Sequence, residues 1–130
     1  MARGAVGRWV ISGVGVDVAL FQSNSQTTVD RADSAAYFYY GSALIIADHC
    51  YQGFDRIESC YKGMTAYVET ASGVQQYVCV DAFQGSNTGA ELLDPQGRNV
   101  AQYNGGNIIC YTCLSTGWQN VMIVVFAPVG

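Results

Sequence analysis

Apolar and polar residues alternate along several stretches of the chain, a pattern typical of β-strands with one buried face. Val14, Val16, Val18 and Leu20 occupy every second position and predict one such face. Residues 64–69 and 74–83 alternate in the same way. In the second of these, alternation predicts one face with Val74, Gln76, Val78, Val80 and Ala82 and another with Tyr77, Cys79, Asp81 and Phe83.

Other stretches are continuously apolar. Residues 43–47, ALIIA, form a short run that predicts a strand buried on both faces. Residues 106–129 contain an apolar strand that ends on a cysteine, a polar loop and a second apolar strand. A cysteine within a strand usually fills the core, whereas one at the end of a strand, facing a loop, can be a nucleophile.

Helical patterns are few. Residues 53–63 have three apolar residues at spacings of three and four, with Lys62 and Gly63 at their end, which suits a helix and a left-handed cap. A second turn or two of helix is predicted within 28–41, although the aromatic run there argues against it. Residues 84–107 are polar and rich in glycine, which predicts a long loop with at most one short strand or turn.

Composition agrees with a mostly β protein. The chain has 130 residues, of which 50% are hydrophobic, and this size suits one domain over residues 1–130 with its own core. Nine tyrosines, 15 glycines and only 12% charged residues favour short strands joined by turns. No repeat or linker divides the chain, so we expect a single barrel-like or sandwich-like β unit.

Charge and hydropathy exclude several functions. A net charge of −4, with six scattered Lys and Arg, offers no basic surface for nucleic acid or an anionic membrane. The longest apolar run, residues 121–129, is far shorter than the roughly 18 residues that suggest a membrane span. The N-terminal residues are interrupted by glycine and Arg8, so we expect no secretory signal in this stretch.

Cysteine and histidine supply the candidate chemistry. Five cysteines leave at least one outside any internal disulfide, and His49 is the only histidine. Cys110 and Cys113 have the C-x-x-C spacing of zinc and redox sites, but residues three apart on a strand point to opposite faces. A thioredoxin-like motif would also need a βαβ context. A nucleophilic pair of His49 and a strand-end cysteine is the better hypothesis.

At this point four blocks of the sequence resemble the sortases, the cysteine transpeptidases of bacterial cell surfaces. The blocks are LIIADHC, GFDRIESCYKGMTAYVE, NIICYTC and VMIVVFAPV, in the same order along the chain. His49 ends the block that corresponds to the family's histidine strand, and Cys113 corresponds to its active cysteine, 64 positions later. The N-terminal stretch GRWVISGVGVDVAL is similar to the family's first strand pair.

The resemblance implies a sortase-like closed β-barrel of about eight strands with one or two short helices. It implies that His49 and Cys113 are catalytic, and that Thr112 adjoins the cysteine in the substrate groove. The family also has an arginine at the start of the strand after the cysteine, and this chain has none there. Asn120 or Gln119 could supply a neutral oxyanion donor instead.

Further expectations concern substrate and setting. Arg98 in the long loop is an alternative donor, and Trp118 and Tyr111 are candidates to shape the peptide groove. The resemblance implies an LPxTG-like sorting motif as acyl donor and an amine acceptor, such as a cell-wall precursor or pilin subunit, at the outer surface of a bacterium. It implies no metal and no organic cofactor. The alternative, from another class, is a sortase-fold peptide-binding or structural module without turnover.

Overall fold

The fold is built almost entirely of β-strands. The computed structural model describes residues 7–22, 34–47, 57, 59–88, 91–114 and 117–129. The strands are β1 (Gly7–Ile11), β2 (Val16–Gln22), β3 (Ser34–Tyr40), β4 (Ala43–Ala47), β5 (Thr65–Thr70), β6 (Gly73–Asn87), β7 (Leu92–Leu93), β8 (Ile108–Leu114) and β9 (Gly117–Pro128). The described residues also include the 3-10 helices η1 (Ser12–Val14) and η4 (Val100–Tyr103).

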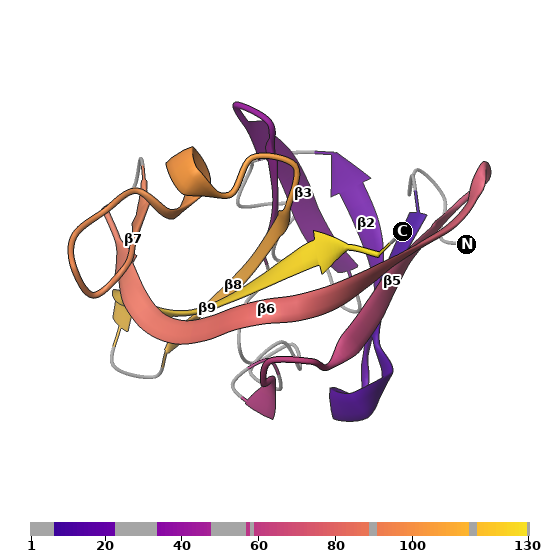
Figure 1. Cartoon of the computed structure of the whole chain (residues 1–130), viewed down its shortest axis with the longest axis horizontal. Helices are drawn as coiled ribbons and strands as arrows, with labels where there is room; N and C mark the ends of the chain where they lie inside the picture. Colours follow the sequence, from indigo (N-terminus) through magenta and orange to yellow (C-terminus); the bar gives the residue numbers. More distant parts are fainter. Residues whose placement is uncertain are drawn as a thin grey trace.

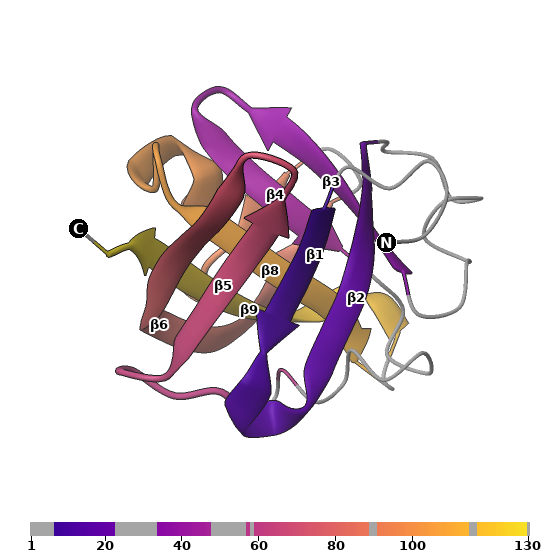
Figure 2. The same cartoon turned by 90° about the vertical axis from the view of Figure 1, so that its right-hand side faces the viewer.

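The strands form one sheet in the order β5-β1-β2-β3-β4-β8-β9-β6-β7, and β5 also pairs with β6. This additional pairing closes eight strands into a barrel and leaves the two-residue β7 attached to the far end of β6 (Figures 1 and 2). Most neighbours are antiparallel, but β2–β3 and β4–β8 are parallel. The prediction of a sortase-like barrel of about eight strands is confirmed.

Two apolar clusters lie on opposite faces of the central strands. The first takes residues from almost every strand of the ring and fills the barrel, with Trp9 packed edge-to-face on Phe126 at 5.0 Å between ring centroids. The second joins the outer face of β4, β8 and β9 to Leu92, Val100 and Ala101. The segment with β7 and η4 therefore covers the outer face of these strands (Figure 1).

Several predicted strands are confirmed. Val16, Val18 and Leu20 are buried on one face of β2, while Val14 lies in η1 and packs against the same cluster. The run ALIIA forms β4, with side chains in both clusters, as expected for a strand buried on two faces.

Of the helix predicted over 53–63, the structure describes Ile57 and Ser59 as 3-10 helix, and the prediction is wrong for residues 60–63. Cys60 N–H donates to the Ile57 carbonyl at 3.0 Å, and a turn at Lys62 and Gly63 follows, in which Met64 N–H donates to the Tyr61 carbonyl at 3.1 Å. The chain leaves the helical path because Gly63 N–H and the Met64 carbonyl bond to the backbone of Cys79 at 2.9 and 2.8 Å. Gly63 has φ of 94°, so the predicted left-handed glycine is present. Residues 53–56 and 58 lie outside the described part.

Two other expectations also need correction. The second helix predicted within 28–41 is wrong for residues 34–40, which form β3 between β2 and β4; residues 28–33 lie outside the described part. The loop predicted over 84–107 begins later, because residues 84–87 extend β6. It contains one short strand, as allowed for, and the 3-10 helix η4.

Gly85 explains why the end of β6 was missed, since glycine is disfavoured within strands. A Cβ at this position would lie 2.3 Å from the carbonyl oxygen of Leu93 and 2.8 Å from a methyl of Ile123. Only glycine lets β7 approach this closely, so the residue that weakens the strand pattern is the one that allows β7 to pack there.

A β-bulge changes the faces predicted for residues 74–83. The pairing of β6 with β9 shifts between Cys79, opposite Phe126, and Asp81, opposite Val125, so Val80 is the extra residue. Tyr77 and Cys79 pack against the barrel core, and after the bulge Ala82 does so too, while Val80 is exposed. The predicted uniform alternation over this strand is therefore wrong beyond Cys79.

No helix in the described ranges is long and apolar enough to cross a membrane.

Candidate active site

Strands β4 and β8 are the ones whose ends carry the predicted catalytic pair. They are parallel neighbours, with Leu44 opposite Ile108 and Ala47 opposite Tyr111. Each pair is 64 positions apart (108 − 44 and 111 − 47), and His49 and Cys113 are also 64 positions apart (113 − 49). The two strands therefore run side by side in the same direction, in a register that matches the spacing of the candidate pair.

The members of this pair are described to different extents. Cys113 belongs to the backbone of β8, where it pairs with Val121 of β9. Its side chain, and His49 as a whole, lie outside the described part of the structure. Their direct contact stays a prediction.

The β8–β9 pairing becomes irregular directly after Cys113. Leu114 pairs with Gly117, so the register shifts between Cys113 and Leu114. The β9 position opposite Cys113 is Val121, which is fully buried in the second cluster. Asn120, one residue earlier, is exposed and pairs with Ser86 of β6. Irregular pairing of this kind is frequent beside active sites, where it redirects side chains.

A hollow of about 390 Å³ begins at this irregular end of the strands. It is lined by residues 84–86 of β6, by the turn from Leu93 to Gly97, by Leu114 of β8 and by Asn120 of β9. Leu114 follows Cys113, and Asn120 precedes its partner Val121. The lining of the hollow therefore includes the residue that follows Cys113 in β8 and the residue that precedes its partner in β9.

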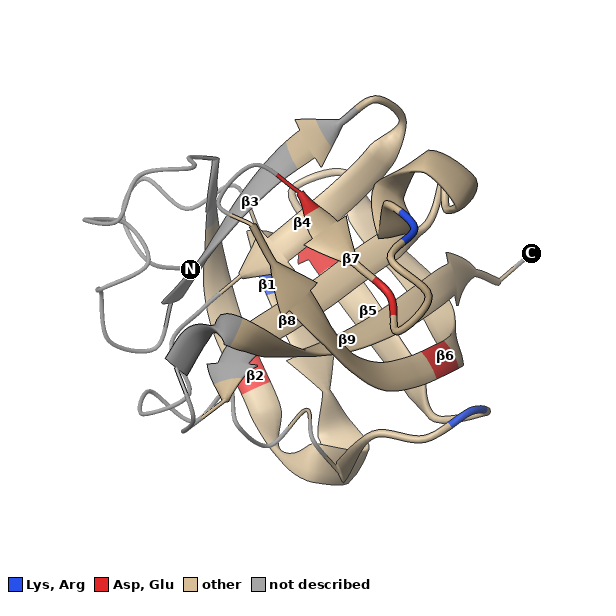
Figure 3. Cartoon of the chain, turned by 90° about the vertical axis from the view of Figure 1, so that its left-hand side faces the viewer, with Lys and Arg blue, Asp and Glu red and all other residues tan. Residues whose placement is uncertain are grey.

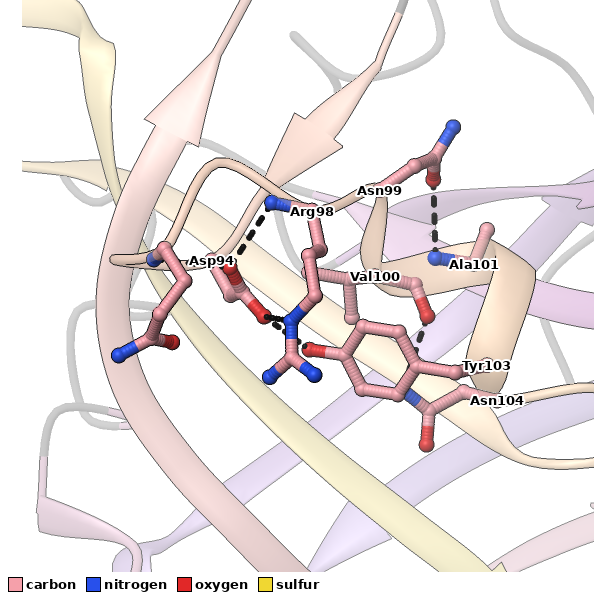
Figure 4. A network of polar contacts seen from close by, with 8 residues as sticks. Asp94, Arg98, Asn99, Val100, Ala101, Tyr103 and Asn104 are labelled. Atoms are coloured by element: carbon pink, nitrogen blue, oxygen red, sulfur yellow. Dashed lines mark hydrogen bonds and ion pairs between the residues drawn. The ribbon is translucent and has the colours of Figure 1, made fainter.

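Asp94 organises the wall of this hollow and is only 5% exposed. One carboxylate oxygen accepts the backbone N–H groups of Gln96 and Arg98 at 2.9 and 3.0 Å. The other accepts Arg98 Nε at 3.0 Å and the Tyr103 hydroxyl at 2.8 Å. Figure 4 shows the Arg98 and Tyr103 side chains converging on Asp94. Four donors therefore fix one carboxylate and connect the turn to η4.

The pKa values reflect this network. Burial alone would raise the pKa of Asp94, but the hydrogen bonds from Arg98, Tyr103 and Gln96 and the positive charge of Arg98 hold it below its ordinary value. Burial and the hydrogen bond to Asp94 raise the pKa of Tyr103 to about 12. Asp94 is therefore an anion at neutral pH and Tyr103 a neutral donor.

The other predicted site residues are placed as follows. The Arg98 guanidinium pairs with Asp94 and lies 5.1 Å from the ring centre of Tyr103, although the side chain is 67% exposed. Thr112 is fully buried and pairs with Met122 of the barrel core, so its side chain does not reach solvent here. The backbones of Trp118 and Gln119 lie in β9, and their side chains are outside the described part. Their predicted roles remain untested.

Three of the five cysteines are structural in their surroundings. Cys60, Cys79 and Cys110 are all buried in the barrel core. Burial and the neighbouring Cys79 raise the pKa of Cys60 to about 12, and burial raises that of Cys79. The thiols of Cys60 and Cys79 are therefore protonated at neutral pH, and thiolate chemistry is left to other cysteines. No group of three or more His, Cys, Asp and Glu suited to a metal occurs among the described residues.

The Asp94 network gives a first prediction. Asp94→Ala removes the shared acceptor, and we expect the amide hydrogens of Gln96 and Arg98 to exchange at least about tenfold faster, the effect of losing one charge-assisted hydrogen bond. Because the pKa of Asp94 is lowered, this protection is complete above the ordinary carboxyl pKa of about 3.9 and is lost as the pH falls through the lower folded-state value.

Hydrogen exchange measured by NMR checks this result. Asp17→Ala is the matched control, because Asp17 pairs with Arg8 on the far β1–β2 hairpin and does not contact the turn. Unchanged exchange at both amides in Asp94→Ala would mean that the turn is held by other contacts.

Comparison with known proteins gives a clear result for structure only. No protein-family model and no curated protein sequence matches the chain. Among solved structures, a Clostridium perfringens sortase D5 transpeptidase superimposes with a TM-score of 0.74 at 15% identity, covering 97% of this chain and 79% of that one. This chain has a sortase-like fold.

Other sortase structures superimpose similarly on this sortase-like barrel. Sortase C-1 from Actinomyces oris has a TM-score of 0.73 at 16% identity, with 98% of this chain and 75% of that one covered. Group B Streptococcus pilus island 1 sortase C2 has a TM-score of 0.73 at 14% identity, with 100% and 77% covered. At such identities the likeness establishes the fold, and the chemistry has to be argued from the residues themselves.

Sequence reasoning missed the residues of the hollow, above all Asp94, Gln84 and Ser86. One signal was available: Asp94-Pro95-Gln96-Gly97 is a typical β-turn sequence, and Gly97 N–H does donate to the Asp94 carbonyl at 2.9 Å. No comparable signal marks Gln84 and Ser86, because they join the hollow only through the unexpected extension of β6.

Proposed function

We propose that this sortase-like chain is a cysteine transpeptidase in which Cys113 is the nucleophile and His49 its acid–base partner. The observation that carries the proposal is the parallel register of β4 and β8, whose offset of 64 equals the separation of the two residues. Continued by two residues beyond Ala47, that register would bring His49 beside Cys113. Neighbouring strands lie about 4.8 Å apart, within reach of a Cys–His interaction.

Parity along the strands supports a shared groove. Cys113 has the same parity in β8 as Ile109 and Tyr111, and its partner in β9 is Val121. Ile109 and Val121 belong to the second cluster on the outer face of the barrel, and Tyr111 packs against it. We therefore assign the reaction to this outer face, beyond the end of the segment with β7 and η4.

The chemistry follows from the residue types. The Cys113 thiolate attacks a peptide carbonyl, the C–N bond breaks, and His49 protonates the departing amine. An amine acceptor then attacks the thioester, loses a proton to His49 and forms a new amide while the thiolate leaves. The acyl donor is an LPxTG-like sorting motif, and the acceptor is an amine on a cell-wall precursor or pilin subunit at a bacterial surface. This scheme uses no metal and no organic cofactor.

Asn120 is our candidate for the oxyanion donor in place of the family's arginine. It lines the hollow and directly precedes Val121, the strand partner of Cys113, and its amide can donate to a developing negative charge. We predict that Asn120→Ala lowers the rate of thioacyl formation by about 10²-fold with little change in stability. The rate of thioacyl formation should fall less in Gln119→Ala and in Arg98→Ala; Arg98 already pairs with Asp94. Single-turnover acylation measures these rates. If all three variants acylate as fast as the unmodified protein, none of these side chains is the oxyanion donor.

A second candidate function is peptide binding without turnover. The observation that favours it is Val121, a buried apolar residue directly opposite Cys113, together with the pairing of Arg98 to Asp94. Val121 has no charge and Arg98 is paired, so neither residue matches the arginine that the family has after its active cysteine. In this case a sorting peptide would bind at the outer face and remain intact.

One experiment separates the two functions. The protein is incubated with a capped LPxTG-like peptide and triglycine, and products are followed by mass spectrometry. A transpeptidase releases the C-terminal fragment and joins triglycine to the acyl fragment. If the peptide binds, as seen by fluorescence anisotropy, but stays uncleaved over many hours, the binding-module function is the correct one.

A further inference from the structure

Two buried cysteines that the proposed reaction does not use, Cys60 and Cys79, belong to distant parts of the chain but to one place in the fold. Cys60 lies before β5, and Cys79 lies in β6. Gly63 N–H donates to the Cys79 carbonyl at 2.9 Å, and Cys79 N–H donates to the Met64 carbonyl at 2.8 Å. The turn that follows Cys60 is therefore fastened to the backbone of Cys79, below β6 in the view of Figure 1.

The chain reverses direction directly after Cys60. Met64 N–H donates to the Tyr61 carbonyl at 3.1 Å, and φ of 94° at Gly63 is the conformation that the third residue of a type II turn needs. Cys60 and Cys79 are both buried in the barrel core, with 7% and 2% of their surface exposed. Burial and the neighbouring Cys79 raise the pKa of Cys60, so the two thiols are close enough to influence each other.

The surroundings of these two thiols do not favour a nucleophile. Figure 3 shows charged residues at isolated positions, and among the described residues the core cluster around the thiols contains no Lys or Arg. Burial raises the pKa of Cys79, and the positive charge of Lys62 lowers it by less. The Cys79 thiol makes one weak hydrogen bond, from Sγ to the Asp81 carbonyl at 3.4 Å. A disulfide would therefore displace little at this position.

Cys110 is the third buried cysteine that the structure describes, and it differs in position. It lies in β8, which is separated from β6 by β9. The turn before β5 bonds to Cys79 of β6, and no bond in the described part joins it to Cys110. Cys60 and Cys79 are therefore the pair that the fold brings together.

We propose that Cys60 and Cys79 form a disulfide when the chain folds under oxidising conditions, and that this bond fastens the turn before β5 to β6. The two residues are 19 positions apart (79 − 60), and the loop between them contains β5 and its hairpin with β6. Closing such a loop restricts the unfolded chain and so stabilises the folded barrel. This inference does not depend on the proposed function.

Glutathione disulfide can supply the oxidising equivalents. The Cys60 thiolate attacks one of its sulfurs, the S–S bond breaks and one glutathione thiolate leaves. The Cys79 thiolate then attacks the Cys60 sulfur of the mixed disulfide and releases the second glutathione. Two protein thiols are thereby oxidised and one glutathione disulfide is reduced. Because burial keeps both thiols protonated in the folded barrel, the exchange is fast only before the core closes.

Oxidative refolding of the full chain tests the disulfide. The reduced, unfolded protein is refolded in a buffer of reduced and oxidised glutathione, the remaining thiols are alkylated, and the product is digested with trypsin. Trypsin separates the cysteines into four peptides, residues 32–56, 57–62, 63–98 and 99–130. Cys60 is alone in the second and Cys79 alone in the third. Mass spectrometry should find these two peptides joined in most molecules, with the loss of two hydrogen atoms.

Stability and kinetics give two further readouts. The oxidised protein should unfold at a urea concentration about 1 M higher than the same protein kept reduced, because the bond restricts the unfolded chain. The same glutathione buffer added to the folded, reduced protein should form the bond at least about tenfold more slowly than refolding does, because the buried thiols are protonated.

Alanine variants provide the controls. Cys60→Ala and Cys79→Ala should lose the joined peptides and the difference in urea midpoint between oxidised and reduced protein. Cys110→Ala is the matched control, because it removes a thiol from the same core, and it should keep both. If a Cys60 or Cys79 variant fails to refold, the peptide map of the unmodified protein still decides.

Three results would overturn the proposal. The first is recovery of Cys60 and Cys79 as alkylated thiols from protein that has refolded to the native tryptophan fluorescence. The second is a bond from either residue to a cysteine in another peptide. The third is a Cys60–Cys79 bond that leaves the urea midpoint unchanged or lowers it, because the bond would then not fasten the turn. Peptide transfer by Cys113 is measured separately, so none of these results bears on the proposed function.

Discussion

Cys113→Ala is expected to abolish thioacyl formation and peptide transfer altogether, because no other described thiol can replace it. Cys60, Cys79 and Cys110 are buried in the barrel core, and the pKa values of the first two are raised. Alanine at position 113 removes the sulfur that forms the thioester, so no residual route through this site remains. Transfer of a fluorescent sorting peptide to triglycine, followed to detection limit, measures the loss.

The matched controls are the core cysteines. Cys79→Ala and Cys110→Ala should retain peptide transfer and lose about 1–2 kcal/mol in free energy of unfolding, as expected for a small buried side chain. Urea denaturation followed by tryptophan fluorescence gives this value. Transfer that survives in Cys113→Ala but disappears in Cys110→Ala would show that the other cysteine of the C-x-x-C pair is the nucleophile.

His49→Ala is expected to lower the rate of thioacyl formation by about 10²–10⁴-fold, the usual contribution of a positioned acid–base group. His49 is the only histidine, so no neighbouring imidazole can substitute. The folded structure should tolerate the change, and the thermal midpoint serves as the check. Single-turnover rates with the same peptide give the comparison.

Small imidazole added to His49→Ala offers a further readout, because it can restore proton transfer to an amine without restoring any lost packing. Partial recovery of the rate supports the acid–base role. A full rate in His49→Ala without imidazole would mean that Cys113 reacts without this partner.

Much of the barrel could be predicted from sequence because the strands bury side chains in simple periodic patterns. The alternation over β2 and the continuous run of β4 reflect burial on one face and on two faces, and both appear in the structure. The order and pairing of the strands could not be obtained this way. It depended on the resemblance to sortases, which the superposition on solved sortases confirms for the fold.

The errors have local physical causes. Val80 interrupts the alternation of β6 because the bulge inserts one residue, and no turn residue marks it. Gly85 sits within a strand because β7 passes within contact distance of its backbone. Residues 60–63 leave the helical path because Gly63 and Met64 bond to Cys79, which is far away in sequence. Each case is a tertiary contact that overrides a local preference.

Only part of the candidate site could be predicted from the sequence. The separation of His49 and Cys113 along the chain equals the register offset of β4 and β8, but the parallel pairing of these strands was not predicted from the sequence. The hollow could not be anticipated, because its walls come from β6, the Asp94 turn, β8 and β9, which are close only in the folded barrel.

The most direct test of the central claim is to map the covalent adduct formed by a sorting peptide whose reacting carbonyl is replaced by an electrophile. The protein is treated at neutral pH with this peptide and, in parallel, with iodoacetamide, and the modified residue is identified by peptide mass spectrometry. The account predicts a single adduct per chain, on Cys113, formed much faster than alkylation by iodoacetamide and slowed in His49→Ala. An adduct on Cys50, or labelling of Cys113 no faster than simple alkylation, would contradict it.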